Sequence, residues 1–206
     1  MHAAIQASRL ALPLMALLAA VPARAMDCAA PRLSGAETWI CATPALLMAD
    51  MSLNDSYRIA ALLAPSRPAL RREQQAWLRA REQCRDQRCL RQSYVDRARQ
   101  LRARIRDWAQ PCAVDPRRIL GDWESIRSGT FDQFQLAPGH RFHSWLHQRP
   151  EFNDKPWTFA ASDCRLSIGA GRDGIAFAFL LAQPRPDRLI LIDSGSLDAQ
   201  LYKKLR

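Results

Sequence analysis

Lysine is almost absent from this chain of 206 residues. Of its 30 basic residues, all but Lys155, Lys203 and Lys204 are arginine, and 20 acidic residues leave a formal net charge of +10. The sequence also lacks a phosphate-binding loop, a nucleophile elbow and a helical pair of histidines with ligand spacing. We therefore expect no enzymatic activity, no cofactor and no metal. The basic charge predicts attraction to anionic surfaces such as lipid headgroups or wall polymers.

Long apolar runs are missing too, with one exception near the start. Leu10 to Val21 is apolar but too short to span a bilayer. Ala23-Arg24-Ala25 follows it and has the small-x-small form of a signal-peptidase site. We expect residues 1–25 to be a signal peptide and the mature chain to begin at Met26; the alternative is a buried N-terminal helix.

Export would change both the charge and the partners of the protein. Loss of Arg9 and Arg24 with the signal peptide lowers the formal charge from +10 to +8. Asp27 directly before Cys28 is unfavourable for lipid acylation. We therefore expect a soluble protein, periplasmic or secreted, that has no nucleic-acid partner.

Six cysteines in an exported chain indicate disulfides rather than a metal site. In an unbroken helix, Cys84 and Cys89 would lie about 140° apart around the axis and could not bond. Either the helix breaks at residues 85–88, or each cysteine pairs with Cys28 or Cys41. A zinc site would need a second close pair, which Cys28 and Cys41 do not supply. The six are Cys28, Cys41, Cys84, Cys89, Cys112 and Cys164.

Composition changes sharply near Pro111, which predicts two units with separate cores, residues 26–110 and 111–206. Glycine and β-branched residues are scarce before this point, whereas strand-like stretches and Gly/Pro turns follow it. The split predicts one disulfide between Cys112 and Cys164 and two among the four cysteines of the first unit. The expected fold class is α+β with two domains, a disulfide-stapled helical bundle followed by a small antiparallel β-barrel.

The first unit has the start and stop signals of helices. Ser34 and Glu37 match a capping box, Thr43-Pro44 matches an N-cap followed by proline at the first helical position, and Ser66 can cap a third helix. A last helix ends before Pro111. Most of its arginines lie off its apolar stripe, which predicts a solvated basic face; they are at positions 91, 97, 99, 102, 104 and 106.

Asp50 and Arg81 fall on apolar helical stripes one helix apart. An internal ion pair would explain both, because the guanidinium can bind a carboxylate through two parallel hydrogen bonds. The alternative is that Arg81 contacts an acidic partner.

The second unit has the signals of a β-meander of six to eight short strands that closes on itself. Residues 131–146 form a hairpin pattern around a Pro138-Gly139 turn, and residues 175–181 and 189–193 are further expected strands. His143 and His147 are four residues apart, which is about 13 Å along a strand and too far for one metal ion. Asp173-Gly174 is an expected turn.

The cysteines and apolar residues of the first unit resemble the LprI-type lysozyme-inhibitor family over residues 27–101. The resemblance is carried by Asp27-Cys28, Glu37-x-x-Ile40-Cys41, Asp50, Tyr57, Trp77-Leu78-x-x-Arg81-x-x-Cys84 and Cys89-Leu90-x-x-x-Tyr94. It implies a small exported helical module that binds a wall-degrading hydrolase such as a lysozyme. Animal-type lysozymes are basic, so acidic residues would have to cluster locally on this basic chain.

Residues 117–206 resemble lipocalin-like domains of exported bacterial proteins. The resemblance rests on Gly121-x-Trp123, a central Trp157, the strand Asp187–Asp193 and the final Tyr202-x-x-Leu205. It implies the alternative function, a small-ligand or anionic-surface binder that acts through the barrel. A structural accessory role in the envelope is a further alternative.

Overall fold

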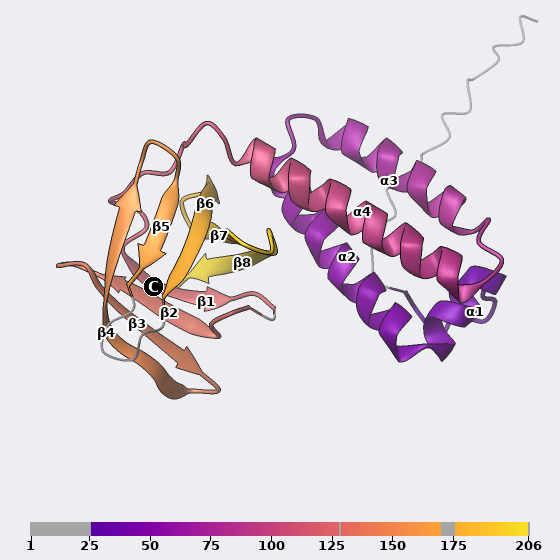
Figure 1. Ribbon diagram of the computed structural model, residues 1–206, viewed down its shortest axis with the longest axis horizontal. Coiled ribbons are helices and arrows are strands. Elements are labelled where there is room, and N and C mark those ends of the chain that lie inside the picture. Colours follow the sequence, from indigo (N-terminus) through magenta and orange to yellow (C-terminus); the bar gives the residue numbers. More distant parts are fainter. Residues whose placement is uncertain (1–25, 128, 170–175, 206) are drawn as a thin grey trace, which may run out of the picture.

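The computed structural model describes residues 26–127, 129–169 and 176–205. In these ranges the chain forms four helices followed by eight strands, which confirms the expected α+β class. The helices occupy one end of the molecule and the strands the other (Figure 1). The expected signal peptide and the expected Asp173-Gly174 turn lie outside the described residues.

The helices begin where the local sequence indicates. Ser34 Oγ accepts a hydrogen bond from the Glu37 amide, and Glu37 accepts one from the Ser34 amide, so the capping box is complete. Ser66 caps the third helix, whereas Thr43 makes no side-chain capping bond. The helices are α1 (Gly35–Ala42), α2 (Pro44–Leu63), α3 (Arg67–Arg81) and α4 (Gln87–Trp108). In the described ranges, none of them is both long and apolar enough to cross a bilayer.

The chain leaves helical geometry between α3 and α4, which answers the question posed by the spacing of Cys84 and Cys89. Asp86 caps α4 by accepting a hydrogen bond of 2.8 Å from the Cys89 amide. The break allows Cys84 and Cys89 to bond to each other. The other disulfides are Cys28–Cys41 and Cys112–Cys164.

The strands form a closed antiparallel barrel in which each strand pairs with the next and β1 pairs with β8. Closure and the β2–β3 hairpin are as the sequence predicts. The fourth strand is longer than expected and starts well before Trp157, and Ile175 lies outside the described residues. The strands are β1 (Gly121–Ser125), β2 (Gln133–Ala137), β3 (Arg141–Leu146), β4 (Arg149–Ala160), β5 (Arg165–Ile168), β6 (Phe177–Arg185), β7 (Arg188–Asp193) and β8 (Ala199–Lys204).

Aromatic side chains fill the interior of the barrel. Phe131, in the connection between β1 and β2, makes edge-on contacts with five other phenylalanine rings at centroid distances of 5.2–6.5 Å. Trp123 and Tyr202 are fully buried in the same cluster. Such T-shaped contacts add to the hydrophobic stabilisation from burial.

The outer face of β6–β8 is covered by the helices. Along β7, Leu189 and Leu191 belong to the barrel core, whereas Ile190 and Ile192 belong to the apolar cluster of the helices. Alternate residues of a strand point to opposite faces, so the four central residues of β7 are all apolar because both faces of the strand are buried there. The helical core therefore continues across Pro111 onto the barrel. Ion pairs from Asp55 to Arg127 (3.0 Å) and from Arg102 to Asp198 (2.6 Å) flank this junction.

Candidate functional site

Asp50 on α2 and Arg81 at the end of α3 meet at the end of the helical region that is remote from the barrel. They are 8% and 5% exposed. Arg81 Nη1 lies 3.5 Å from Asp50 Oδ1. The two side chains are thus brought together, but through one long contact rather than the two parallel hydrogen bonds that the sequence suggests.

Tyr94 of α4 bridges the pair. Arg81 Nη1 donates to Tyr94 Oη at 3.1 Å, and Tyr94 Oη donates to Asp50 Oδ1 at 2.8 Å. Burial of the Tyr94 ring raises the pKa of its hydroxyl well above the usual value of 10.0. The hydroxyl therefore stays protonated and acts as a donor to Asp50 over the physiological range.

The strongest contacts of Arg81 go to Glu82. Arg81 Nη2 and Nε donate to Glu82 Oε1 at 2.6 and 3.2 Å. Desolvation acts to lower the pKa of Arg81, but the hydrogen bonds to Glu82 and Tyr94 outweigh it and raise the pKa above its ordinary value. Arg81 is a permanent cation in this site.

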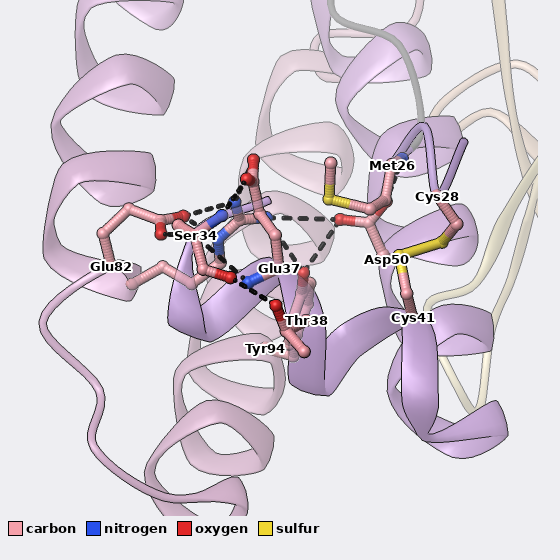
Figure 2. A network of polar contacts seen from close by, with 10 residues as sticks. Met26, Cys28, Ser34, Glu37, Thr38, Cys41, Asp50, Glu82 and Tyr94 are labelled. Atoms are coloured by element: carbon pink, nitrogen blue, oxygen red, sulfur yellow. Dashed lines mark hydrogen bonds and ion pairs between the residues drawn. A yellow bond between two sulfur atoms is a disulfide. The ribbon is translucent and has the colours of Figure 1, made fainter. Parts of the chain in front are cut away.

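A third carboxylate completes the cluster. Glu37 Oε1 lies 4.0 Å from Arg81 Nη2. Ser34 ties the two glutamates together, since its amide donates to Glu37 Oε2 at 2.8 Å and its hydroxyl donates to Glu82 (Figure 2). The capping box of α1 is therefore part of the same network.

Trp77 closes the site on its apolar side. The Arg81 guanidinium lies 5.6 Å from the Trp77 ring centroid, and Trp77 packs edge-on against Tyr94 at 5.4 Å. The indole nitrogen of Trp77 donates to Ser93 Oγ at 3.0 Å. A cation over an indole face is stabilised electrostatically, so the ring holds the guanidinium in place.

The N-terminal segment supplies the last partner of Asp50. The backbone nitrogen of Met26 donates to Asp50 Oδ2 at 2.7 Å (Figure 2). The Cys28–Cys41 disulfide holds this segment against α1. We call Asp50, Arg81, Glu37, Glu82 and Tyr94, with the Met26 nitrogen, the corner network.

The sequence indicated only part of this network. Tyr94 was expected as a member of the apolar stripe of α4, and nothing in the local pattern of Glu82 or Met26 suggested a role. A tyrosine on an apolar stripe opposite a buried Asp–Arg pair is the one signal that was available, because a buried hydroxyl needs a partner. Chemically, the corner network combines one buried guanidinium with three carboxylates and a protonated tyrosine hydroxyl.

Arg97 of α4 is an exception to the expected solvated basic face. It is 4% exposed, and its Nε donates to Gln74 Oε1 at 2.9 Å. Its Nη2 atom has no hydrogen-bond partner among the described residues. Burial lowers the pKa of Arg97 below its ordinary value.

The histidines of the barrel do not converge. His143 Nδ1 contacts Asn153 Oδ1 at 2.5 Å, and His147 lies beyond the end of β3. Within residues 26–127, 129–169 and 176–205, no three His, Cys, Asp or Glu side chains are placed to share a metal ion.

A small cavity of about 60 Å³ lies where α2 meets β8, outside the barrel interior. Its lining includes Asp55, Arg58, Ile126, Arg127 and Gln200. Typical ligand pockets measure about 300–1,000 Å³. A drug-sized molecule would therefore not fit in this cavity.

Comparison with known proteins identifies no similar protein. No family model matches the chain. No curated protein and no solved structure matches it either.

Proposed function

We propose that the protein is an exported binding protein of the cell envelope, built from a helical-bundle domain (residues 26–110) and a lipocalin-like barrel domain (residues 111–206), and that it acts without catalysis. Its first candidate partner is a wall-degrading hydrolase such as a lysozyme, as the resemblance of residues 27–101 to the LprI-type family implies.

One observation supports a basic partner at the helical end. The corner network gathers Asp50, Glu37 and Glu82 around the single guanidinium of Arg81, so it carries a local excess of negative charge in a chain of net charge +10. The side chains of Glu37 and Glu82 are 26% and 30% exposed. Complementary charge increases the association rate of a basic partner and suppresses wrong partners.

The test measures cell-wall lysis by several lysozyme types in the presence of the oxidised, exported protein. We expect a saturable loss of lysozyme activity that weakens with added salt. Glu82→Gln keeps an acceptor for Arg81 but removes one charge, so it should weaken inhibition, whereas Asp115→Asn in the exposed connection to the barrel should not. Unchanged lysis for every lysozyme type would contradict the inhibitory function.

A second candidate is binding to an anionic envelope surface. Arg88 and Arg91 are exposed near the start of α4 and have no ion-pair partner in the described part of the chain. Arg99 and Arg106 lie on the same helix but are paired with Asp96 and Asp107. Unpaired surface cations attract anionic surfaces over roughly one Debye length, about 8 Å at physiological salt.

The variants of α4 provide a matched test of this candidate. Replacing Arg88 and Arg91 by Gln should reduce retention on vesicles that contain anionic lipid, and salt should abolish retention of the unmodified protein. Replacing Arg99 and Arg106 by Gln removes the same charge from paired positions and should have the smaller effect. Equal effects of the two pairs would argue for net charge alone, without a defined surface. The filled barrel interior gives no support to the small-ligand alternative.

A further inference from the structure

The Met26 nitrogen lies where a cation would neutralise the Asp50 carboxylate, although in the uncut chain this nitrogen is a neutral amide. It is the nearest donor to Asp50 Oδ2, at 2.7 Å. The closest guanidinium nitrogen of Arg81 is 3.5 Å from the other carboxylate oxygen, and the short contact of Arg81, 2.6 Å, goes to Glu82. Asp50 is thus a buried carboxylate that shares its one cation with two other carboxylates.

A buried carboxylate is costly unless a close cation and hydrogen bonds compensate it. Asp50, Glu37 and Glu82 carry three negative charges, against one positive charge on Arg81. In the described residues, no other Lys or Arg side chain lies within ion-pair distance of Asp50. A positive charge at the Met26 nitrogen would supply what the corner network lacks.

The sequence places a cleavage signal at this nitrogen. Ala23-Arg24-Ala25 has the small-x-small form recognised by signal peptidase, and Met26 is the next residue. The position of Met26 is also fixed from the other side. Cys28 is bonded to Cys41 of α1, and the Ala29 and Ala30 amides donate to the Asp27 side chain and carbonyl at 3.0 and 3.2 Å.

We propose that hydrolysis of the Ala25–Met26 peptide bond by signal peptidase creates an α-ammonium group that binds Asp50 and completes the corner network. One water molecule is consumed, Ala25 keeps the new carboxylate, and the Met26 amine takes up a proton at neutral pH. The same nitrogen that donates as an amide then donates as a cation. This inference rests on the export that the proposed function includes.

The experiment compares two forms of the oxidised protein, one exported and processed, and one that carries Gly-Ser before Met26. The extension keeps the N–H donor and removes its charge. N-terminal sequencing of the processed form should give Met26. NMR titration of its isotopically methylated α-amine should give a pKa at least one unit, a tenfold change in proton affinity, above the ordinary 7.7–8.0.

Stability against urea gives an independent result. A raised pKa in the folded state means that the added stability is fully present below about pH 8 and is lost as pH rises through the folded pKa. The processed form should therefore exceed the extended form in urea midpoint at pH 7, and the difference should vanish at high pH. Asp50→Asn should abolish this difference, whereas Asp115→Asn, which removes an exposed carboxylate outside the corner network, should preserve it.

Each contrary result overturns the inference: an N-terminus other than Met26, an α-amine with an ordinary pKa, or equal stability of the two forms at pH 7. If Asp50→Asn does not fold, the pKa and the extended form decide between the outcomes. Lysozyme inhibition with an ordinary α-amine pKa would overturn this inference alone. A raised pKa without hydrolase or surface binding would overturn the proposed function alone, and native protein that keeps residues 1–25 in the cytosol would overturn both.

Discussion

Replacing Arg81 by Met tests whether the corner network stabilises the helical region. The substitution keeps most of the apolar stem of the side chain and removes its charge. It leaves Asp50 with Tyr94 and the Met26 nitrogen as its partners, and it removes both hydrogen bonds from the guanidinium to Glu82. The cation that three carboxylates share is lost.

The expected cost follows from the burial of the partners. Removing one member of a buried ion pair typically costs about 3–5 kcal/mol, because the remaining charge stays desolvated. Asp50 is 8% exposed, so water screens little of the charge that remains after Arg81 is removed, and most of the penalty applies to Asp50. The Glu82 side chain is 30% exposed, so solvent screens much of its share. We expect a loss of about 3 kcal/mol in the free energy of unfolding, at the lower end of the range.

Urea denaturation of the oxidised protein at pH 7, followed by far-ultraviolet circular dichroism, measures this loss. Arg79→Met is the matched control, because Arg79 is exposed on the same helix and should change stability by less than about 0.5 kcal/mol. Adding Asp50→Asn to Arg81→Met should restore part of the loss, since it removes the stranded charge. A loss under about 1 kcal/mol for Arg81→Met, or strict additivity of the two substitutions, would refute the reasoning.

Four further substitutions probe other parts of the molecule. Tyr94→Phe should cost about 1–3 kcal/mol of unfolding free energy at pH 7. Because burial raises the pKa of Tyr94 above 10.0, the stability difference between the unmodified protein and this variant should shrink above pH 10. Urea titrations at several pH values measure this difference, and an unchanged difference above pH 10 would contradict the reasoning. Asp193→Ala should cost at most about 1 kcal/mol, since two turn amides bond this half-exposed carboxylate. Those bonds lower the pKa of Asp193 below 3.8, so the cost should disappear as pH falls through that lowered pKa, and persistence at pH 2 would count against the turn. Replacing Cys112 and Cys164 by Ser opens a loop of 52 residues and should cost about 4 kcal/mol, measurable by thermal unfolding. Ile190→Ala should cost about 2–4 kcal/mol, since Ile190 is fully buried between β7 and the helices, and a loss under about 0.5 kcal/mol would mean that the helices do not pack there.

The helices could be predicted from the sequence because their ends are determined locally. In α1, α3 and α4, the cap residue has a side chain that accepts a hydrogen bond from the amide three residues along the chain; the cap residues are Ser34, Ser66 and Asp86. The start of each of these helices can therefore be located from the residue types alone. The Cys84–Cys89 disulfide required one further fact, that the helix breaks between them. Asp86 has a side chain that can cap a helix, but a residue of this type does not by itself exclude a continuous helix.

The corner network was only half accessible to sequence analysis. Periodicity placed Asp50 and Arg81 on buried faces, and a buried charge needs a partner. Periodicity does not describe how α1, α3 and α4 pack around α2, and this packing decides that Arg81 turns to Glu82 and Tyr94. Arg97 is missed for the same reason, because a long side chain that starts near the edge of an apolar stripe can turn inward when a neighbouring helix offers a Gln74 acceptor.

The barrel shows a similar division between local and long-range information. Turn residues and alternating apolar positions predicted the strands and their closure. The length of β4 was not predicted, because Pro150 and Pro156 interrupt its pattern, and register shifts between β3 and β4 accommodate the irregular strand. The apolar run of β7 was predicted as a strand, and its pairing with β6 and β8 confirms this. Burial of both faces of β7 could not be predicted from the sequence, because it depends on how the helices pack on the barrel.

The positions of the disulfides connect oxidation to recognition. Cys28–Cys41 fixes the segment that carries Met26, and Cys84–Cys89 fixes the turn directly after Arg81 and Glu82. Both cross-links therefore border the corner network, and neither lies at the junction with the barrel. Asp50, Trp77, Arg81 and Tyr94 are already engaged with one another inside this corner. The proposed basic partner would therefore meet the exposed edges of Glu37 and Glu82, which these residues hold in place. Replacing these four cysteines by Ser should then weaken binding of the proposed partner by loosening this edge, while the barrel keeps its own disulfide, Cys112–Cys164.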